Sequence, residues 1–356
     1  MNILILRVSS IGDVIHTLPA IFLIKKLNPH AKISWIVQEK AACILKDQDF
    51  LENVWVIPDK FLKIQKWPET IKIIKEIKKY KWDAILDFQG IMKTSIFLFF
   101  LKGPKYGFDY KNSRMGLTSY FTTDQMTPEY KNIIQKNLAL TSYMLKKYNK
   151  NNYIQTPNIE SLKKDFRLNI SEERKTAVKN WLKKNNIKKF IALTPNTTWT
   201  SKEWPTENWK YLFDYLNKIN KYSIVLIGKD FGKQAYELSK DIKEKNLNFF
   251  IAPNWNLLTT SYLISKTELF IAPDTGLLHM ADFLNKKTIG IFGPTLVKKH
   301  GPFFNQANIK NAIQIKCSYL YKRSHTKNKF IKNKNCMYNL TPENLFVKIK
   351  QILNFG

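Results

Sequence analysis

The sequence lacks several features that mark particular classes of protein. It has only three cysteines, Cys43, Cys317 and Cys336, and no C-x-x-C pair, so it predicts neither a disulfide framework nor a zinc site. None of its apolar runs reaches the roughly 18 residues needed to span a bilayer. Arg7 and Asp13 interrupt the apolar amino-terminal stretch, which argues against a signal peptide. We therefore expect a soluble or peripheral protein of a reducing compartment.

Acidic residues are also scarce: 28 Asp and Glu stand against 58 Lys and Arg, for a formal charge of +30. Such a charge favours partners that carry phosphate, namely nucleic acid, an anionic membrane surface or a phosphorylated substrate. Because Lys, Asn and Ile are abundant together, compositional bias is an alternative explanation. No stacking pattern of aromatics and no nucleic-acid-binding motif is present, so we expect no nucleic-acid partner.

The charge is unevenly distributed along the chain. Residues 283–342 contain no Asp or Glu. We expect this acid-free stretch to form a positive face that holds the protein on an anionic membrane by charge, with binding that weakens as salt is added. Its basic residues are Lys286, Lys287, Lys298, Lys299, Lys310, Lys316, Lys322, Arg323, Lys327, Lys329, Lys332 and Lys334.

The length of 356 residues favours two domains with a cleft between them. In both halves, β-branched runs alternate with segments of helical period, which predicts a parallel, doubly wound sheet in each lobe. A polar stretch at 149–161 is the best linker, giving lobes 1–160 and 161–356. The expected strands are 2–8, 32–38, 53–58 and 83–88, then 189–194, 223–228, 248–252, 268–273 and 288–294.

Ser10, Gly12 and Asp13 follow the first strand and precede an apolar helix. In a parallel sheet this turn lies at the carboxyl edge, where ligands bind. The alternative is structural, with Asp13 as a helix N-cap and Gly12 making the turn. Neither G-x-G-x-x-G nor a Walker lysine is present, so the turn is not a dinucleotide or P-loop fingerprint.

A second such turn, Asp274 to His279, follows a strand of the second lobe and begins a helix. The free N–H groups of Thr275, Gly276 and Leu277 are suited to bind a diphosphate. The alternatives are that Asp274 only caps the helix and that His279 is a packed histidine under the turn.

A hydroxyl-rich loop with Thr197, Thr198 and Lys202 follows the first strand of the second lobe. Hydroxyls and an ammonium suit phosphate oxygens, although Lys202 taken alone is one basic residue among many. Because the sequence has no D-x-D on an obvious loop and no histidine spacing typical of metal ligands, we expect no metal and no cofactor.

Five blocks occur in the order found in one enzyme family. Together they resemble glycosyltransferase family 9, the ADP-heptose:lipopolysaccharide heptosyltransferases. The resemblance implies a GT-B fold of two Rossmann-like lobes, the first binding the acceptor and the second the nucleotide sugar. The blocks are S-S-I-G-D-V-I-H-T-L-P (9–19), D-F-Q-G-I-M-K-T-S (87–95), K-E-W-P (202–205), D-T-G-L-L-H (274–279) and G-P-T (293–295).

The blocks differ in which member of the family they resemble. The D-x-Q-G-x-x-K block is most similar to heptosyltransferase I, which adds the first heptose to Kdo-lipid A. Residues 336–342 are closer to the pattern of heptosyltransferase II, and a donor other than ADP-heptose stays open. The resemblance also implies a cytoplasmic enzyme, peripheral on the inner face of the inner membrane of a Gram-negative bacterium.

The family resemblance further implies an inverting reaction and roles for the singled-out residues. Asp13 would be the base that takes the proton of the acceptor hydroxyl, with Ser10, Gly12, Lys93 and Arg114 on the acceptor side. The donor side would comprise Thr197, Thr198, Lys202, Asp274, Thr275, Gly276, Leu277 and His279.

Two positions depart from the family pattern. The acidic residue that holds the ribose is replaced near Gly232, leaving Asp230 or Glu237 as substitutes. Asn132 stands where the family has a histidine after the acceptor loop. Lys60, Lys63 and Lys66 match acceptor-side lysines only in character, and solvated lysines are the alternative.

Overall fold

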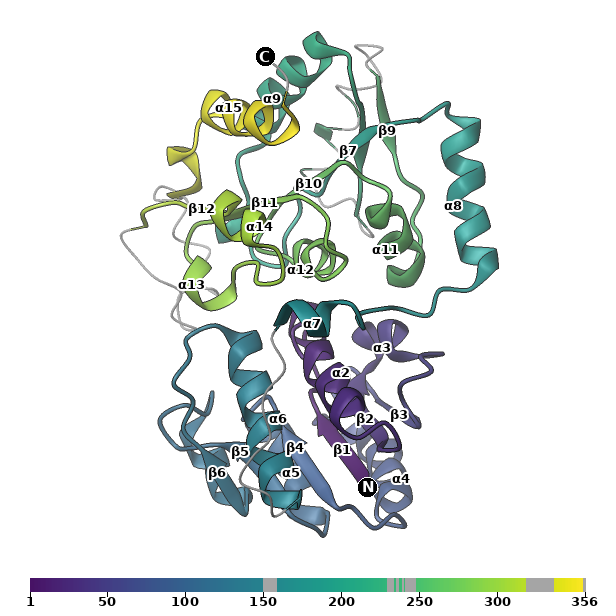
Figure 1. The fold of residues 1–356 in the computed structure, drawn as a ribbon, viewed down its shortest axis with the longest axis vertical. Coiled ribbons are helices and arrows are strands. Elements are labelled where there is room, and N and C mark those ends of the chain that lie inside the picture. The colour runs from purple at the N-terminus through teal and green to yellow at the C-terminus, as the bar shows by residue number, and fades with distance from the viewer. Residues whose placement is uncertain are drawn as a thin grey trace. The chain divides into compact units, whose positions relative to one another are not determined.

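The computed structural model describes residues 1–149, 159–228, 234, 237–238, 240, 248–317 and 336–354. The chain divides into two compact units, Met1–Asn169 (unit 1) and Ile170–Gly356 (unit 2) (Figure 1). Most of the expected linker lies outside the described residues, and its last three residues begin helix α7 (Ile159–Lys163). Unit 1 therefore extends beyond the expected boundary at residue 160.

Unit 1 is built on a six-stranded parallel sheet of order β3-β2-β1-β4-β5-β6. The four strands expected from β-branched runs are present; β5 and β6 were not predicted, because their short sequences carry no such run. β1 and β4 are neighbours at the point where the strand order reverses, so the loops after them meet at the carboxyl edge. The strands are β1 (Asn2–Leu6), β2 (Lys32–Gln38), β3 (Asn53–Ile57), β4 (Ala84–Asp87), β5 (Lys105–Phe108) and β6 (Asp124–Met126).

Helices of unit 1 cover the sheet through apolar faces. Ile77 of α4 and Phe97 of α5 are fully buried in one cluster with Leu4 and Leu6 of β1. Because side chains alternate across a strand, α4 and α5 cover the same face of the sheet, while α2 and α6 pack against each other. The helices are α1 (Ile11–Ile15), α2 (Leu18–Leu27), α3 (Glu39–Leu45), α4 (Trp67–Ile77), α5 (Met92–Phe100), α6 (Ile133–Asn149) and α7, with 3-10 turns η1 (Ile64–Lys66) and η2 (Gly116–Phe121).

Unit 2 repeats this topology, with a parallel sheet of order β12-β11-β10-β7-β8-β9. Numbered within their own unit, both sheets have the order 3-2-1-4-5-6, which confirms the predicted pair of doubly wound lobes. Here β7 and β10 are the neighbours at the reversal. The strands are β7 (Phe190–Leu193), β8 (Ser223–Leu226), β9 (Phe249–Ile251), β10 (Leu269–Pro273), β11 (Thr288–Phe292) and β12 (Ile313–Gln314).

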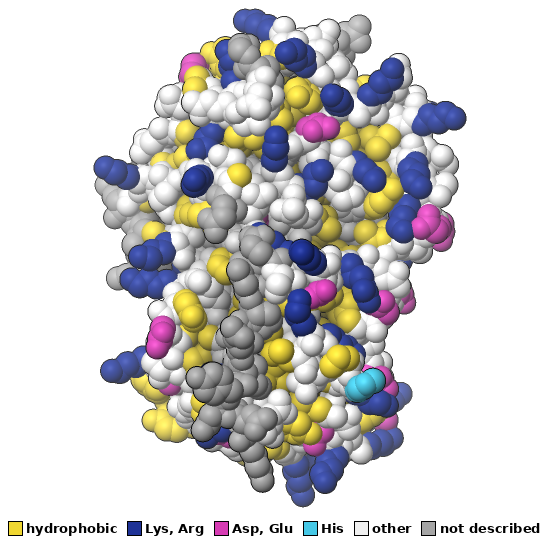
Figure 2. Space-filling model, in the orientation of Figure 1, with side chains coloured by type: hydrophobic (Ala, Val, Ile, Leu, Met, Phe, Trp, Pro, Cys, Tyr) yellow, Lys and Arg dark blue, Asp and Glu magenta, His cyan; other side chains and the backbone are white. Residues whose placement is uncertain are grey.

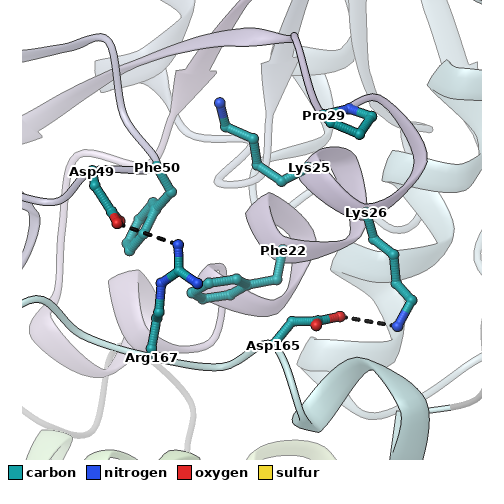
Figure 3. Close-up of a pocket in the computed structure, with 8 residues that line it drawn as sticks. All are labelled: Phe22, Lys25, Lys26, Pro29, Asp49, Phe50, Asp165 and Arg167. Carbon is teal, nitrogen blue, oxygen red and sulfur yellow. Dashed lines mark hydrogen bonds and ion pairs between the residues drawn. The ribbon is translucent and has the colours of Figure 1, made fainter.

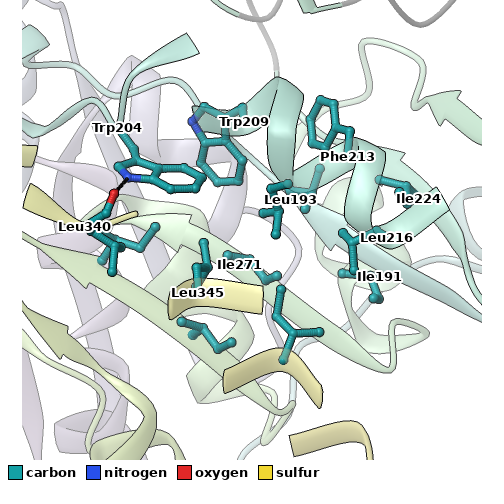
Figure 4. Close-up of a cluster of buried hydrophobic side chains, with 14 of the residues drawn as sticks. Ile191, Leu193, Trp204, Trp209, Phe213, Leu216, Ile224, Ile271, Leu340 and Leu345 are labelled. Carbon is teal, nitrogen blue, oxygen red and sulfur yellow. Dashed lines mark hydrogen bonds between the residues drawn. The ribbon is translucent and has the colours of Figure 1, made fainter. Parts of the chain in front are cut away.

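Two tryptophans anchor the core of unit 2 (Figure 4). Trp204 and Trp209 are fully buried and meet edge to face, with ring centroids 4.9 Å apart. The indole N–H of Trp204 donates to the backbone oxygen of Leu340 at 3.0 Å, so the loop before α9 is fixed to the chain before α15. The helices are α8 (Glu172–Lys184), α9 (Thr206–Ile219), α11 (Leu257–Ser265), α12 (Gly276–Phe283), α13 (Val297–His300), α14 (Gln306–Asn311) and α15 (Pro342–Leu353), with 3-10 turns η3 (Thr200–Lys202) and η4 (Cys336–Asn339).

Cys317 and Cys336 form one disulfide, a single bridge that the expectation of no disulfide framework did not include. The two residues are 19 apart in sequence, and the fold brings their Cα atoms to 5.2 Å by placing Cys317 after β12 and Cys336 at the start of η4. The residues between them, 318–335, lie outside the described part of the chain. The expected charges at Lys322, Arg323, Lys327, Lys329, Lys332 and Lys334 belong to that segment.

The described surface is strongly basic. In the view of Figure 2, Lys and Arg side chains are spread over the visible face and outnumber Asp and Glu side chains. Positive charge is therefore not confined to the acid-free stretch. None of the described helices is both long and apolar enough to cross a bilayer.

Candidate functional site

The loop after β1 places Asp13 inside the first turn of α1 rather than at its N-cap, which is Ser10. The backbone N–H of Ser10 donates to Asp13 Oδ2 at 3.1 Å, and the Ser10 hydroxyl lies 3.4 Å from the same oxygen. This is the reciprocal half of a capping box, in which a third-position carboxylate satisfies the N-cap amide. The N-cap interpretation of Asp13 is therefore wrong, although Asp13 does stabilise the start of the helix.

Arg7, the residue after β1, is a partner of Asp13 that was not predicted from the sequence. Its Nη2 lies 2.6 Å from Asp13 Oδ1, and its Nη1 donates to the backbone oxygen of Phe88. The Arg7 side chain is 3% exposed and that of Asp13 19%. The sequence did carry a signal for this pair: a charged residue follows an apolar strand, and a buried guanidinium needs an acidic partner.

Arg114 approaches the other carboxylate oxygen, with Nη1 3.5 Å from Asp13 Oδ2. Burial by itself would raise the pKa of Asp13, but the guanidinium groups of Arg7 and Arg114 outweigh it and hold that pKa well below its usual range. Asp13 is therefore a carboxylate throughout the physiological pH range.

The loop after β4 is bonded to the loop after β1. Gln89 accepts from the N–H of Val8 at 2.8 Å and donates to the backbone oxygen of Ser9 at 2.7 Å. Gly90 has φ +57, and a Cβ there would collide with Ser113. Only glycine adopts this conformation without strain, and the Gly90 oxygen accepts from Met115 N–H at 2.9 Å, beside Arg114.

Most of the expected acceptor-side residues gather at this edge of unit 1. Ser10 and Arg114 contact Asp13 directly, and Gly12 is part of the same turn. Lys93 stands in the first turn of α5, half-buried. Asn132, by contrast, is 8% exposed and accepts from the N–H of Ile134 at 2.9 Å, so its side chain is used at the start of α6.

In unit 2, the loops after β7 and β10 bring Lys202 and Asp274 together, as the strand order requires. Lys202 Nζ lies 2.7 Å from Asp274 Oδ2, and His279 Nε2 lies 3.0 Å from Asp274 Oδ1. All three side chains are at most 14% exposed. Burial would raise the pKa of Asp274, but the His279 hydrogen bond and the Lys202 charge hold it well below its usual range.

The start of α12 differs from the expected capping. Thr275 is the N-cap, and its hydroxyl accepts from Leu278 N–H at 3.4 Å. Asp274 therefore does not cap this helix: its carboxylate is already engaged by Lys202 and His279. Among the described residues, the N–H groups of Thr275, Gly276 and Leu277 have no hydrogen-bond acceptor, so they are available to an anion.

The remaining residues predicted on the donor side differ in where the structure places them. Thr197 uses its hydroxyl within its own loop, donating to the Trp199 backbone oxygen and accepting from Trp199 N–H at 3.1 Å. Thr198 is exposed in the same loop. Glu237 is helical and half-buried, whereas Asp230 and Gly232 lie outside the described residues.

A pocket of about 460 Å³ in unit 1 is a separate feature (Figure 3). Two ion pairs border it, Arg167 to Asp49 at 3.2 Å and Lys26 to Asp165 at 2.9 Å. Apart from Asp165 and Arg167, which follow α7, its lining residues precede β2 or β3, so it lies at the amino edge of the sheet, opposite the edge where ligands bind in such folds. Within the described part of the chain, no three His, Cys, Asp or Glu side chains are grouped as a metal site.

Comparison with known proteins agrees with this architecture. The lipopolysaccharide heptosyltransferase 1 of Campylobacter coli is 28% identical over 301 residues, covering 83% of this chain and 84% of its own. The lipooligosaccharide heptosyltransferase 2 of Campylobacter jejuni is 23% identical over 359 residues, covering 99% and 98%.

The solved structure of the E. coli heptosyltransferase WaaC with ADP matches with a TM-score of 0.75 at 21% identity, covering 99% of this chain and 100% of that one. The fold is thus the GT-B type that the sequence predicted. A family model described as glycosyltransferase family 9 (heptosyltransferase) matches residues 70–331. Since this match spans well over half of the chain, the protein belongs to glycosyltransferase family 9 and is a glycosyltransferase.

Proposed function

We propose that this enzyme transfers L-glycero-D-manno-heptose from ADP-heptose to the Kdo-lipid A inner core, as a heptosyltransferase I. The observation that carries the proposal is the pair of sites at the two strand-order reversals of a family 9 chain. Unit 1 holds an ionised carboxylate between two guanidiniums, and unit 2 holds Lys202 beside the free N–H groups of α12. The first suits a proton acceptor and the second a diphosphate.

In the proposed reaction, an acceptor hydroxyl oxygen attacks C1 of the heptose while the bond from C1 to the ADP oxygen breaks. Asp13 receives the hydroxyl proton. Because Arg7 and Arg114 hold the pKa of Asp13 low, it is a weak base, and proton transfer must come late, once the new bond has made the hydroxyl acidic. Arg114, 46% exposed, is also accessible to an anionic group of the acceptor.

The leaving ADP needs stabilisation of the charge that gathers on its diphosphate. Lys202 and the N–H groups of Thr275, Gly276 and Leu277 supply it, with the hydroxyl of Thr198 available in the neighbouring loop. Lys202 is paired with Asp274 in this structure, so the diphosphate competes with that carboxylate for the ammonium. His279 orients Asp274 so that its carboxylate can meet a sugar hydroxyl.

Subtype I is favoured over subtype II by the higher identity to the heptosyltransferase 1 of C. coli and by the D-F-Q-G-I-M-K block. In that block, Gln89 and Gly90 connect the loop after β4 to the Asp13 and Arg114 segments. The relative named heptosyltransferase 2 covers more of the chain, so II is the second candidate.

We place the enzyme at the cytoplasmic face of the inner membrane of a Gram-negative bacterium, where its basic surface meets anionic lipid.

Mass spectrometry of lipopolysaccharide from a deletion strain tests this function. If the enzyme adds the first heptose, the deletion strain should lack every heptose, and a plasmid copy should restore them. Retention of a single heptose would assign the enzyme to a later step and overturn subtype I. An unchanged core would overturn the proposed function.

The low pKa of Asp13 predicts a flat acid side of the pH–rate profile. Asp13 acts as a base only in its ionised form, and that form is protonated only as pH falls through the depressed pKa of Asp13. Between about pH 8 and pH 5, kcat/KM should therefore not fall through protonation of Asp13. Profiles of the wild type, Arg114→Gln and the surface variant Arg167→Gln at constant ionic strength test this. The expectation would be contradicted if kcat/KM fell on the acid side within that range and the midpoint of the fall shifted to higher pH only in Arg114→Gln. Such a result would show that Asp13 titrates there.

A further inference from the structure

An apolar groove of about 270 Å³ on unit 1 is lined by residues of α4 and α5 and of the turn before η1. Leu62 lines it from the turn before η1, Trp67 and Ile71 line it from α4, and Ile96 and Phe100 line it from α5. Phe61 and Ile74, two buried members of the core cluster, also line the groove, so it opens to the surface from the core between these helices. No part of the site described above contributes to it.

Large apolar side chains protrude around this groove. Ile64 is 81% exposed and Phe99 68%, and Leu62 and Trp67 are each 42% exposed. Ile64 lies between Leu62 and Trp67 in the chain, and the Phe99 ring meets that of Phe100 at 5.1 Å. Single exposed apolar residues are ordinary, but such a group beside a groove marks a contact surface. We call Leu62, Ile64, Trp67, Ile71, Phe99 and Phe100 the α4–α5 patch.

The segment that carries most of the α4–α5 patch is rich in lysine. Residues 60–81 contain eight lysines and two glutamates. The two glutamates are already paired, Glu69 with Lys66 at 3.7 Å and Glu76 with Lys79 at 2.7 Å. Within the described chain, Lys75 and Lys78, which line the groove, have no ion-pair partner.

We propose that the α4–α5 patch docks the enzyme on the surface of an anionic bilayer. Exposed Ile and Trp side chains insert at the level of the headgroups, where Trp is favoured, while surrounding lysines contact lipid phosphates and keep their stems against the apolar groove. A second copy of this chain is disfavoured, because two such lysine-rich surfaces repel each other. Nucleic acid would leave the apolar groove unfilled.

This surface deepens the proposed function, since it names where the enzyme meets the membrane that carries its lipid acceptor. It differs from the acid-free stretch at 283–342, which offers charge without a described apolar patch. The two surfaces therefore respond to different substitutions.

Vesicle binding by the full-length protein tests the patch. Sedimentation uses phosphatidylglycerol/phosphatidylethanolamine vesicles and phosphatidylcholine vesicles, each at 0.1 M and 1 M salt. The variant Ile64→Asp/Lys75→Glu should lower partitioning onto the anionic vesicles about tenfold or more, because a lysine near such a surface contributes several-fold and the apolar wedge is lost. Both positions are exposed, so the fold should persist, which the melting temperature checks.

The matched control, Val347→Asp/Lys218→Glu, makes the same charge change at exposed positions of α15 and α9. It should keep near wild-type binding. The proposed docking role of the patch would be overturned if the control lost vesicle binding equally, or if Ile64→Asp/Lys75→Glu bound vesicles as the wild type does.

Heptose transfer to acceptor in detergent micelles reports the proposed function separately. The patch variant should retain transfer there, and a parallel loss of micellar transfer would count against a docking role. If the wild type binds vesicles through the patch but transfers no heptose, the proposed function fails and the docking surface stands.

Discussion

Asp13→Asn should lower turnover about 10²- to 10⁴-fold while ADP still binds with unchanged affinity. Asn keeps the size of Asp and an oxygen that can accept from the Ser10 N–H, but it cannot receive the proton of the acceptor hydroxyl. ADP affinity should persist because the proposed diphosphate contacts lie in unit 2. ADP release with the natural acceptor measures turnover, and calorimetry measures ADP affinity.

The melting temperature of Asp13→Asn should fall, since Arg7 is 3% exposed and loses its counter-charge. Asp165→Asn is the matched control, because it makes the same charge change at an exposed pair with Lys26 and should leave turnover intact. A purely structural Asp13 predicts a different result, because a variant that remains folded would then keep its turnover even if its melting temperature fell. A folded Asp13→Asn enzyme with more than about a tenth of wild-type turnover would remove Asp13 as the base.

Lys202→Ala should weaken ADP binding by roughly 10- to 150-fold, which corresponds to the 1.5–3 kcal/mol typical of a hydrogen bond to a charged group. The substitution removes the ammonium and also leaves the Asp274 carboxylate facing the diphosphate without its cation. Calorimetry on the purified variant measures the loss. Lys218→Ala, an exposed lysine of α9, is the control and should bind ADP as the wild type does.

The same variant should also show a weaker dependence of stability on acid than the wild type. Asp274 has a depressed pKa in the fold, so its pairing stabilises the protein above the ordinary carboxyl pKa of about 4 and is lost as pH falls through the folded value. Without Lys202 that folded pKa rises toward the unfolded value, so the variant should be less stable at neutral pH and should lose less stability than the wild type as pH falls to 3. If neither the ADP affinity nor the melting temperature between pH 3 and pH 7 changes, Lys202 is an ordinary surface lysine.

The sequence alone determined the architecture. The strand-like runs in both halves were long enough, and their alternation with helical segments regular enough, to predict two parallel sheets. The short strands β5, β6 and β12 were not predicted, because they have few apolar or β-branched residues and owe their conformation to neighbouring strands. The turns carrying Asp13 and Asp274 were predictable for the same reason as the sheets, since each directly follows a strong strand.

Only the tertiary structure decided which side chains meet. Arg7 and Asp13 are close in sequence, but their pairing depends on the end of β1 turning into α1 beside Phe88 of the neighbouring strand's loop. Lys202 and Asp274, 72 residues apart, meet because β7 and β10 are adjacent where the strand order reverses. Thr275, not Asp274, caps α12, and the Asp274 carboxylate is instead bound by the distant Lys202 and the nearby His279. Local patterns specify elements and their order, whereas contacts between distant loops depend on which strands become neighbours and which charges must be paired once buried.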